Sequence, residues 1–248
     1  MIKTFLKILC IVSVSLLFSC QETQLSAKQI LSRSLEAHGG LSNWEQVDSI
    51  SFHKKTTLYT REGLKEKEIN QHQAFYLGDG FNGRIFSYGD PQIVYSLKDG
   101  EYAMTKGDSS IILNDVKKQS LKTMFNSAYY VISQPFHLKE SNANLILKKD
   151  TVINDRKTYV LDISYLGDNS TSDNWTYFFD AETFLITSCR VKHKTTVSYI
   201  KNLVYDTNTP FVFNAERESV FLNNDGTKDY VRASYLYSDY RVVLKSNL

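Results

Sequence analysis

The chain has 248 residues, of which 29 are lysine or arginine, 27 are aspartate or glutamate and 13% are aromatic. This near-neutral balance excludes a nucleic-acid-binding protein that depends on a basic surface, because phosphate recognition requires clustered cationic side chains and this sequence has them only in pairs such as Lys54 and Lys55. The aromatic content and the presence of only three prolines favour a long-stranded β protein over a disordered chain.

The N-terminal segment predicts export. Lys3 and Lys7 precede an apolar run, residues 8–17, which at about ten residues is too short to span a bilayer as a helix of about 20 residues. We therefore expect residues 1–19 to be a signal peptide that is removed after export. Its removal takes away two lysines and no acidic residue, so 27 residues of each charge remain in the mature chain.

The residues around the expected cleavage site resemble the lipobox of bacterial lipoproteins. Leu17, Ser19 and Cys20 stand at its positions, and only Phe18 is a less usual choice. The resemblance implies that the Cys20 thiol is acylated and becomes the new N-terminus, with residues 20–25 as a lipidated tether. Each buried CH₂ group stabilises the membrane-bound state by about 0.8 kcal/mol, so two or three acyl chains would anchor the protein durably. The alternative is an ordinary secretory peptide with an incidental cysteine.

A short amphipathic helix and a β-hairpin are predicted after the tether. Ser26 can cap the helix, and Gly39-Gly40 ends it. Residues 41–47 add a turn that carries Trp44. Two long strands follow, predicted at 49–59 and 64–77.

A β meander and a second helix are predicted next. Strands are expected at 84–88, 92–97 and 101–105, with Asp99-Gly100 supplying the positive φ angles of a tight hairpin turn. Between Asn114 and Ile132 the pattern becomes helical, because Leu121, Met124, Phe125, Ala128 and Ile132 form one apolar face. Pro135 is predicted to close this segment.

From residue 143 the chain returns to strands, predicted at 145–152, 158–165, 175–179, 184–192, 196–205, 211–222 and 230–242. Mostly short turns join them, which indicates antiparallel pairing, because parallel strands need crossover connections of a dozen or more residues. The predicted fold class is mainly β (α+β): a large curved antiparallel sheet forming an open half-barrel, with two or three helices packed on its concave side. Residues 26–248 are expected to form this single domain.

The sequence contains a partial match to a dinucleotide-binding motif. Residues 78–83 fit the letters of G-x-G-x-x-G, but that motif must open a helix, and residues 84–88 are predicted as a strand. We interpret the segment as a turn. The five histidines lack the spacing of metal ligands, and Ser109 lacks the flanking glycines of a nucleophile elbow. The sequence therefore predicts no metal site and no cofactor.

Two carboxylate pairs and one cysteine are weaker candidates for chemistry. Glu66 and Glu68, and likewise Glu216 and Glu218, alternate along a strand and share a face, which could build a paired-acid site but more often meets water. Cys189 is left without a disulfide partner and lies in an apolar run, which is typical of a buried, inert thiol. We predict no catalytic residue.

The apolar faces of the strands are more informative. Alternate aromatic residues on several strands point to one side of the sheet. That side can be filled by the protein's own helices, or it can stay partly open as a pocket for an apolar ligand, and the sequence leaves both alternatives open. The predicted lining of such a cavity comprises Trp44, Met124, Phe125, Tyr159, Trp175, Tyr177 and Phe179.

The order of elements resembles the LolA, LolB and LppX class of lipoprotein carriers, whose half-barrel holds acyl chains beneath a helical lid. Residues 37–41 (Ala-His-Gly-Gly-Leu) with Trp44, and residues 177–186, are similar to an uncharacterised family of Gram-negative envelope lipoproteins related to that class. The resemblance implies a half-barrel with an apolar cavity, but it assigns no catalytic or ligand-contacting residue. We expect the helix at 114–132 to act as the lid, because its apolar stripe would face the sheet.

The leading functional hypothesis is a non-catalytic cell-envelope lipoprotein that binds a lipid or acyl chain between sheet and helices and contacts the membrane through Cys20. Gln21 stands where an aspartate tends to retain enteric lipoproteins at the inner membrane, so the resemblance favours the outer membrane of a Gram-negative bacterium. The alternative is an anchored structural or interaction module with a filled core and an unspecified protein partner. A hydrolase with an unrecognised site is the third hypothesis.

Overall fold

The structure of the protein is a computed structural model that describes residues 24–140, 143–165, 174–193 and 196–245. The predicted signal peptide and the proposed lipidation site at Cys20 lie outside the described residues. No helix in the described ranges is both long enough and apolar enough to cross a membrane.

The described strands form one antiparallel sheet of 14 strands. The N-terminal strands are β1 (Val47–Tyr59), β2 (Lys65–Tyr76), β3 (Asn82–Ser87), β4 (Asp90–Lys98), β5 (Glu101–Lys106) and β6 (Ser109–Ile111). The C-terminal strands are β7 (Ala143–Leu147), β8 (Thr151–Ile153), β9 (Arg156–Tyr165), β10 (Asn174–Asp180), β11 (Ile186–His193), β12 (Thr196–Asp206), β13 (Phe213–Leu222) and β14 (Lys228–Leu244).

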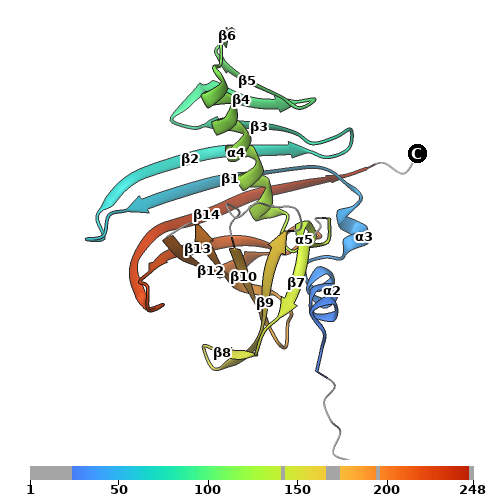
Figure 1. Cartoon of the computed structure of the whole chain (residues 1–248). Coiled ribbons are helices and arrows are strands. Elements are labelled where there is room, and N and C mark those ends of the chain that lie inside the picture. Colours follow the sequence, from blue (N-terminus) through green and yellow to red (C-terminus); the bar gives the residue numbers. More distant parts are fainter. Residues whose placement is uncertain (1–23, 141–142, 166–173, 194–195, 246–248) are drawn as a thin grey trace, which may run out of the picture.

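The spatial order of the strands shows that the sheet does not close into a barrel. It runs β6-β5-β4-β3-β2-β1-β14-β13-β12-β11-β10-β9-β7, with β8 paired to β9. Pairing of β1 with β14 joins the N-terminal and C-terminal halves in the middle of the sheet. Strands β6 and β7 remain as edges, and the sheet curves around the helices (Figure 1). The predicted open half-barrel is confirmed.

Four helices are found among the described residues: α2 (Ala27–Ala37), α3 (Leu41–Trp44), α4 (Asp115–Ile132) and α5 (Phe136–Glu140). Ser26 caps α2 as predicted, since its hydroxyl accepts a hydrogen bond from the Gln29 amide and the Gln29 side chain accepts one from the Ser26 amide. Asn114 caps α4, and Asp115 places a negative charge in its first turn, where it interacts favourably with the positive end of the helix dipole.

Helix α4 crosses the inner face of the sheet over β1 to β5, and α2 lies beside β7 (Figure 1). The predicted stripe of α4 is correctly placed, because Leu121, Phe125, Ala128 and Ile132 are buried. Met124 lies at the margin of the core and is half-buried. The helix therefore covers the concave face, as expected of the segment 114–132.

The structure differs from the sequence prediction in several places, which include the unpredicted short strand β6 (Ser109–Ile111). Helix α4 ends at Ile132, three residues before Pro135, and the unpredicted helix α5 begins directly after that proline. The strand predicted at 145–152 is divided into β7 and β8 by residues 148–150, where the polar run Lys-Lys-Asp interrupts the alternation. The strand predicted from Phe184 begins only at Ile186, because Phe184 has a positive φ of 59°. The predicted turn at Asp99-Gly100 is confirmed by φ angles of 51° and 82°.

Candidate functional site

A pocket of about 700 Å³ opens between the C-terminal half of α4 and the sheet. This volume lies within the range of about 300–1,000 Å³ that is typical of small-molecule sites. Most of the exposed lining is apolar. The pocket is lined by Trp44, Glu45, Val47, Leu77, Gly80, Phe81, Asn126, Tyr129, Tyr130, His137 and Lys245.

Stacked aromatic rings build the wall formed by α3 and α5. The Trp44 and Phe136 rings are nearly parallel, at 3°, with centroids 4.4 Å apart. The Phe211 ring packs edge-on against both. Gly39 permits this arrangement, because a Cβ atom there would lie 2.6 Å from the Pro210 carbonyl oxygen. The segment 37–44 is therefore a packing motif that delivers Trp44 to the pocket.

The opposite wall is the connection between β2 and β3, where the glycine-rich segment 78–83 runs from the turn into the first two residues of β3. The Phe81 ring stacks on Phe75 with centroids 5.9 Å apart and lies 4.8 Å from Tyr129 on α4. Gly80 has a φ of +104°, and a Cβ atom on Gly78 would lie 2.2 Å from a carboxylate oxygen of Asp48. These glycines serve a tight turn and close packing, which confirms the interpretation as a turn.

Polar groups gather at the rim of the pocket. The Lys245 ammonium donates a hydrogen bond of 3.0 Å to the Glu45 carbonyl oxygen, and the Lys245 amide donates one of 2.7 Å to the carbonyl of Gln46. These bonds hold the end of β14 against the end of α3. The pocket therefore combines an aromatic interior with a rim that carries both charges, an arrangement suited to an amphiphilic ligand.

A tyrosine cluster lies behind the pocket. The Tyr130 hydroxyl is 2.7 Å from that of Tyr177 and 3.0 Å from that of Tyr165, and the Gln134 amide donates to Tyr177 over 2.7 Å. Burial raises the pKa of Tyr130 and of Tyr177 well above the ordinary value, so both stay neutral at physiological pH. The cluster joins α4 to β9 and β10 and fixes the orientation of Tyr130.

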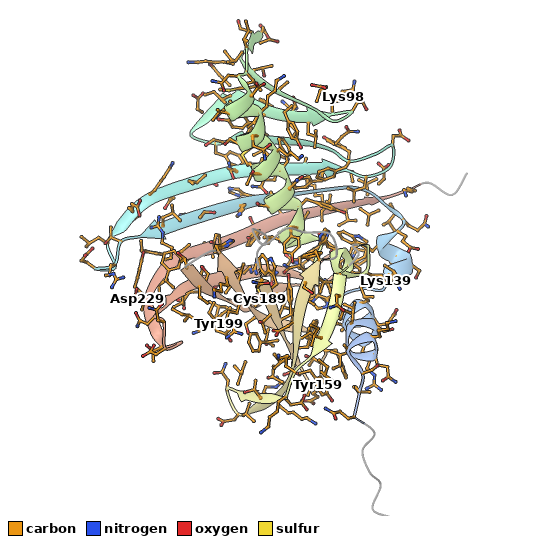
Figure 2. All side chains as sticks on the ribbon, in the orientation of Figure 1. Lys98, Lys139, Tyr159, Cys189, Tyr199 and Asp229 are labelled. Carbon is orange, nitrogen blue, oxygen red and sulfur yellow. The ribbon has the colours of Figure 1, made fainter. Side chains whose placement is uncertain are left out.

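The structure separates the seven predicted cavity residues. Trp44 lines the pocket. Phe125, Tyr177 and Phe179 are fully buried and belong to the packed core, and Met124 and Tyr159 are half-buried against it. Trp175 lines a second hollow, of about 450 Å³, across β7 and β9 to β12. Tyr159 lies at the lower end of β9, away from α4 (Figure 2).

The two alternatives for the concave face therefore both occur, in different places. The face is filled where Phe125 packs on the sheet, and it is open at the end of α4. The remaining pocket residues were not predicted. The helical periodicity of α4 could have indicated that Tyr129 faces the sheet, because it follows Phe125 by one turn. Nothing in the sequence pattern of residues 77–81 or around Lys245 indicated a pocket.

Three of the four acidic residues of the predicted pairs, Glu66, Glu68 and Glu218, form ion pairs. Glu66 pairs with Arg232, and Glu68 pairs with Lys55 at 3.3 Å and with Lys65 at 2.9 Å. Cys189 on β11 (Figure 2) is fully buried, which confirms the predicted burial, and burial raises the pKa of its thiol. In the part of the chain that the structure describes, no group of three or more His, Cys, Asp or Glu side chains could hold a metal ion.

The second motif, residues 177–186, is organised by Asp180. Its carboxylate accepts hydrogen bonds from the amides of Glu182 and Thr183, at 3.0 and 2.8 Å, and pairs with Arg156 at 2.7 Å. Burial acts to raise the pKa of Asp180, but the hydrogen bonds from Thr183 and Glu182 and the charge of Arg156 outweigh it and hold the pKa below its usual value. This motif stabilises the turn between β10 and β11.

Comparison with known sequences identifies one family. The model of a family of unknown function, DUF6503, matches residues 2–247, which is nearly the whole chain. No curated protein is significantly similar to the chain in sequence. The family match carries no statement of activity or ligand.

Several solved structures resemble the chain, and the two with a TM-score of 0.54 share its fold. A putative outer membrane lipoprotein-sorting protein domain from Vibrio parahaemolyticus is 10% identical, with a TM-score of 0.54 over 90% of this chain and 95% of that one. A DUF1329 family protein from Desulfovibrio piger is 8% identical, with a TM-score of 0.54 over 87% and 92%. A LolA superfamily protein from Nitrosomonas europaea is 10% identical, with a TM-score of 0.47 over 91% and 96%. The predicted resemblance to the lipoprotein-carrier class is confirmed at the level of fold.

Proposed function

The chain belongs to the family DUF6503, and from its half-barrel fold and its pocket we propose that it binds a lipid or acyl chain between α4 and the sheet. The observation that carries the proposal is the aromatic pocket built by Trp44, Phe81 and Tyr129, with Lys245 at its rim. Because apolar ligands bind where they leave water for an apolar wall, this pocket favours a hydrocarbon chain. The protein catalyses no reaction in this proposal.

The size of the pocket supports useful affinity. Burying about twelve methylene groups would contribute about 10 kcal/mol, at about 0.8 kcal/mol for each group. Ordering of the chain and loss of its free motion offset part of this gain, so we expect micromolar dissociation constants. The aromatic walls are held by stacking contacts, so little rearrangement is needed for binding.

We also propose that the protein works at the cell envelope, anchored by acyl chains on Cys20. This part of the proposal rests on the lipobox resemblance of residues 17–20 and on the name of the Vibrio parahaemolyticus structure, a putative outer membrane lipoprotein-sorting protein domain. Replacing Cys20 with alanine is expected to release the protein from the membrane fraction. Retention of that variant in the membrane would contradict the anchor, with no consequence for the pocket.

The main alternative is an anchored interaction module. It is supported by the full burial of Phe125, Tyr177 and Phe179, which fill much of the concave face with the protein's own side chains. In that case the pocket at the end of α4 would bind no lipid, and the protein would be recovered with a specific protein partner instead.

Lipid extraction distinguishes the two hypotheses. The Cys20→Ala variant, which lacks covalently attached acyl chains, is purified from bacterial cells without detergent, and its organic extract is identified by mass spectrometry. We expect a lipid or fatty acid in an amount comparable to that of the protein. An extract without lipid, together with an inability of the delipidated protein to bind added fatty acid, would contradict the proposal.

A further inference from the structure

Two cationic side chains on the concave face converge on the same pair of tyrosines. Lys54 on β1 shares a face with the buried Phe52, because alternate residues of a strand point the same way. Tyr237 on β14 is its register partner, and Tyr235 is the register partner of Arg217 on β13. The Lys54 ammonium lies 5.3 Å from the ring centroid of Tyr235 and 5.6 Å from that of Tyr237.

Arg217 is a buried cation whose partners among the described residues are neutral. Only 4% of its surface is exposed, and its Nε donates a hydrogen bond of 2.9 Å to the Asn202 side-chain oxygen. Its Nη2 lies 3.8 Å from the Cys189 sulfur, and Tyr237 is a further hydrogen-bond partner. None of these partners is a carboxylate. Arginine is rarely buried unless it is paired, because removing a charge from water is costly.

Lys54, too, has no acidic partner among the residues that the structure describes. No ion pair within the described ranges joins Lys54 or Arg217 to an aspartate or glutamate. The contrast with Lys55 is direct, because Lys55 points to the opposite face of β1 and pairs with Glu68 at 3.3 Å. The concave face therefore carries two positive charges that the neighbouring described side chains do not balance.

We propose that Lys54 and Arg217 form a binding site for a phosphate or carboxylate group. A guanidinium and an ammonium are complementary to the oxygens of such an anion, and their attraction is stronger in a partly buried place than in water. Lys54 and Tyr235 are half-buried, so an anion can reach them from solvent. Arg217 is buried, and its positive charge attracts the anion from beneath the surface. The site is distinct from the pocket at the end of α4, whose lining includes none of these residues.

The anion can be free or can be the head group of an amphiphile, and three ligands distinguish these sources. Inorganic phosphate, dodecyl phosphate and dodecanol are titrated calorimetrically against the wild-type protein. Binding of inorganic phosphate indicates a site for the free anion. Tighter binding of dodecyl phosphate than of dodecanol, without binding of phosphate alone, indicates a lipid head group. The proposal is overturned if the protein binds no inorganic phosphate and also binds dodecyl phosphate no more tightly than dodecanol.

The variants Lys54→Met and Lys55→Met form a matched pair on opposite faces of one strand. We expect Lys54→Met to weaken the binding of phosphate, or to reduce the preference for dodecyl phosphate over dodecanol, by at least about tenfold, whereas Lys55→Met leaves both unchanged. Equal behaviour of the two variants would overturn the proposal. Because Lys54 is half-buried, this test does not depend on the stability of a variant at the fully buried Arg217. The dodecanol titration reports on the apolar pocket separately.

Discussion

The ring of Phe125 on α4 lies directly over Gly83 on β3, so close that a Cβ atom on the glycine would come within 2.8 Å of the ring. Phe125 also meets the Phe75 ring edge-on, with centroids 6.4 Å apart. This contact fixes the distance between helix and sheet. Because Asn126 and Tyr129 follow on the same helix, it also sets the position of the pocket wall.

Replacing Gly83 with alanine should push α4 away from the sheet. Overpacking of a filled core typically costs about 1–3 kcal/mol, and we expect a loss of unfolding free energy in this range. The control is Gly89→Ala, where the nearest atom to a new Cβ is the Ser87 hydroxyl oxygen at 3.8 Å. Urea unfolding measures both variants. Equal midpoints for the two variants would show that the close approach at Gly83 does not matter.

Replacing Phe125 with aspartate places a carboxylate in the core beneath α4. Phe125 has no exposed surface, and even removal of such a ring typically costs about 3–5 kcal/mol, so we expect this variant to unfold or to lose at least that stability. Ser127→Asp, on the exposed side of the same helix, is the control. Circular dichroism during thermal unfolding provides the measurement. Unchanged stability and ligand binding in Phe125→Asp would contradict the observed placement of α4.

Asp180 and Glu182 both contact Arg156, but they differ in burial. Asp180 is almost completely buried and holds the turn after β10, whereas Glu182 is exposed. Asp180→Asn is expected to lower the free energy of unfolding by about 1–2 kcal/mol, because charge-assisted hydrogen bonds are lost. Glu182→Gln should change it by less than about 0.5 kcal/mol. Chemical denaturation compares the two, and a larger effect at Glu182 would refute this account of the motif.

His38 should make folding stability depend on pH. Its Nδ1 donates a hydrogen bond of 2.8 Å to the Ser34 carbonyl, and burial lowers the pKa of His38 to about 4. The unfolded chain, with a histidine pKa of about 6.5, therefore binds more protons between these values, and stability falls as the pH decreases from about 6.5 to 4. The maximum loss from this group is about 3 kcal/mol.

The variant His38→Gln tests the assignment of this pH dependence. Unfolding free energies are measured between pH 4 and pH 7 for the wild type, His38→Gln and His72→Gln. The slope of the unfolding free energy against pH should decrease mainly in His38→Gln, because His38 is buried whereas His72 is only half-buried. If the unfolding free energy of His38→Gln depends on pH as steeply as that of the wild type, another group causes the pH dependence.

Periodicity made the fold predictable from the sequence. The spacing of Leu121, Phe125 and Ala128 indicated a helix with one buried face, and the structure buries these three residues. Short turns such as Asp99-Gly100 indicated antiparallel neighbours. The helix α5 was not predictable in this way, because its five residues are too few to show a helical period.

The pocket was less predictable, because a pattern of apolar residues does not distinguish a packed core from an open cavity. Tyr177 and Phe179 have the alternation expected of a cavity wall, yet other side chains cover them completely. Lys245 and Phe81 reach the pocket from distant parts of the chain through tertiary packing alone. For Arg217 a signal did exist, because the inward alternation of Phe211, Phe213 and Ala215 continues to that residue.

The central claim, that the pocket at the end of α4 binds a lipid chain, is tested most directly by blocking the pocket. Asn126→Trp introduces a large ring at a pocket-lining position of the helix surface, and Ser127→Trp introduces the same ring next to it, outside the lining. The dissociation constant of a fluorescent fatty acid is measured for both variants and the wild type. The account predicts that Asn126→Trp weakens binding by at least about tenfold and that Ser127→Trp binds as the wild type does. Equal affinity of all three proteins, or no binding to the wild type, would contradict it.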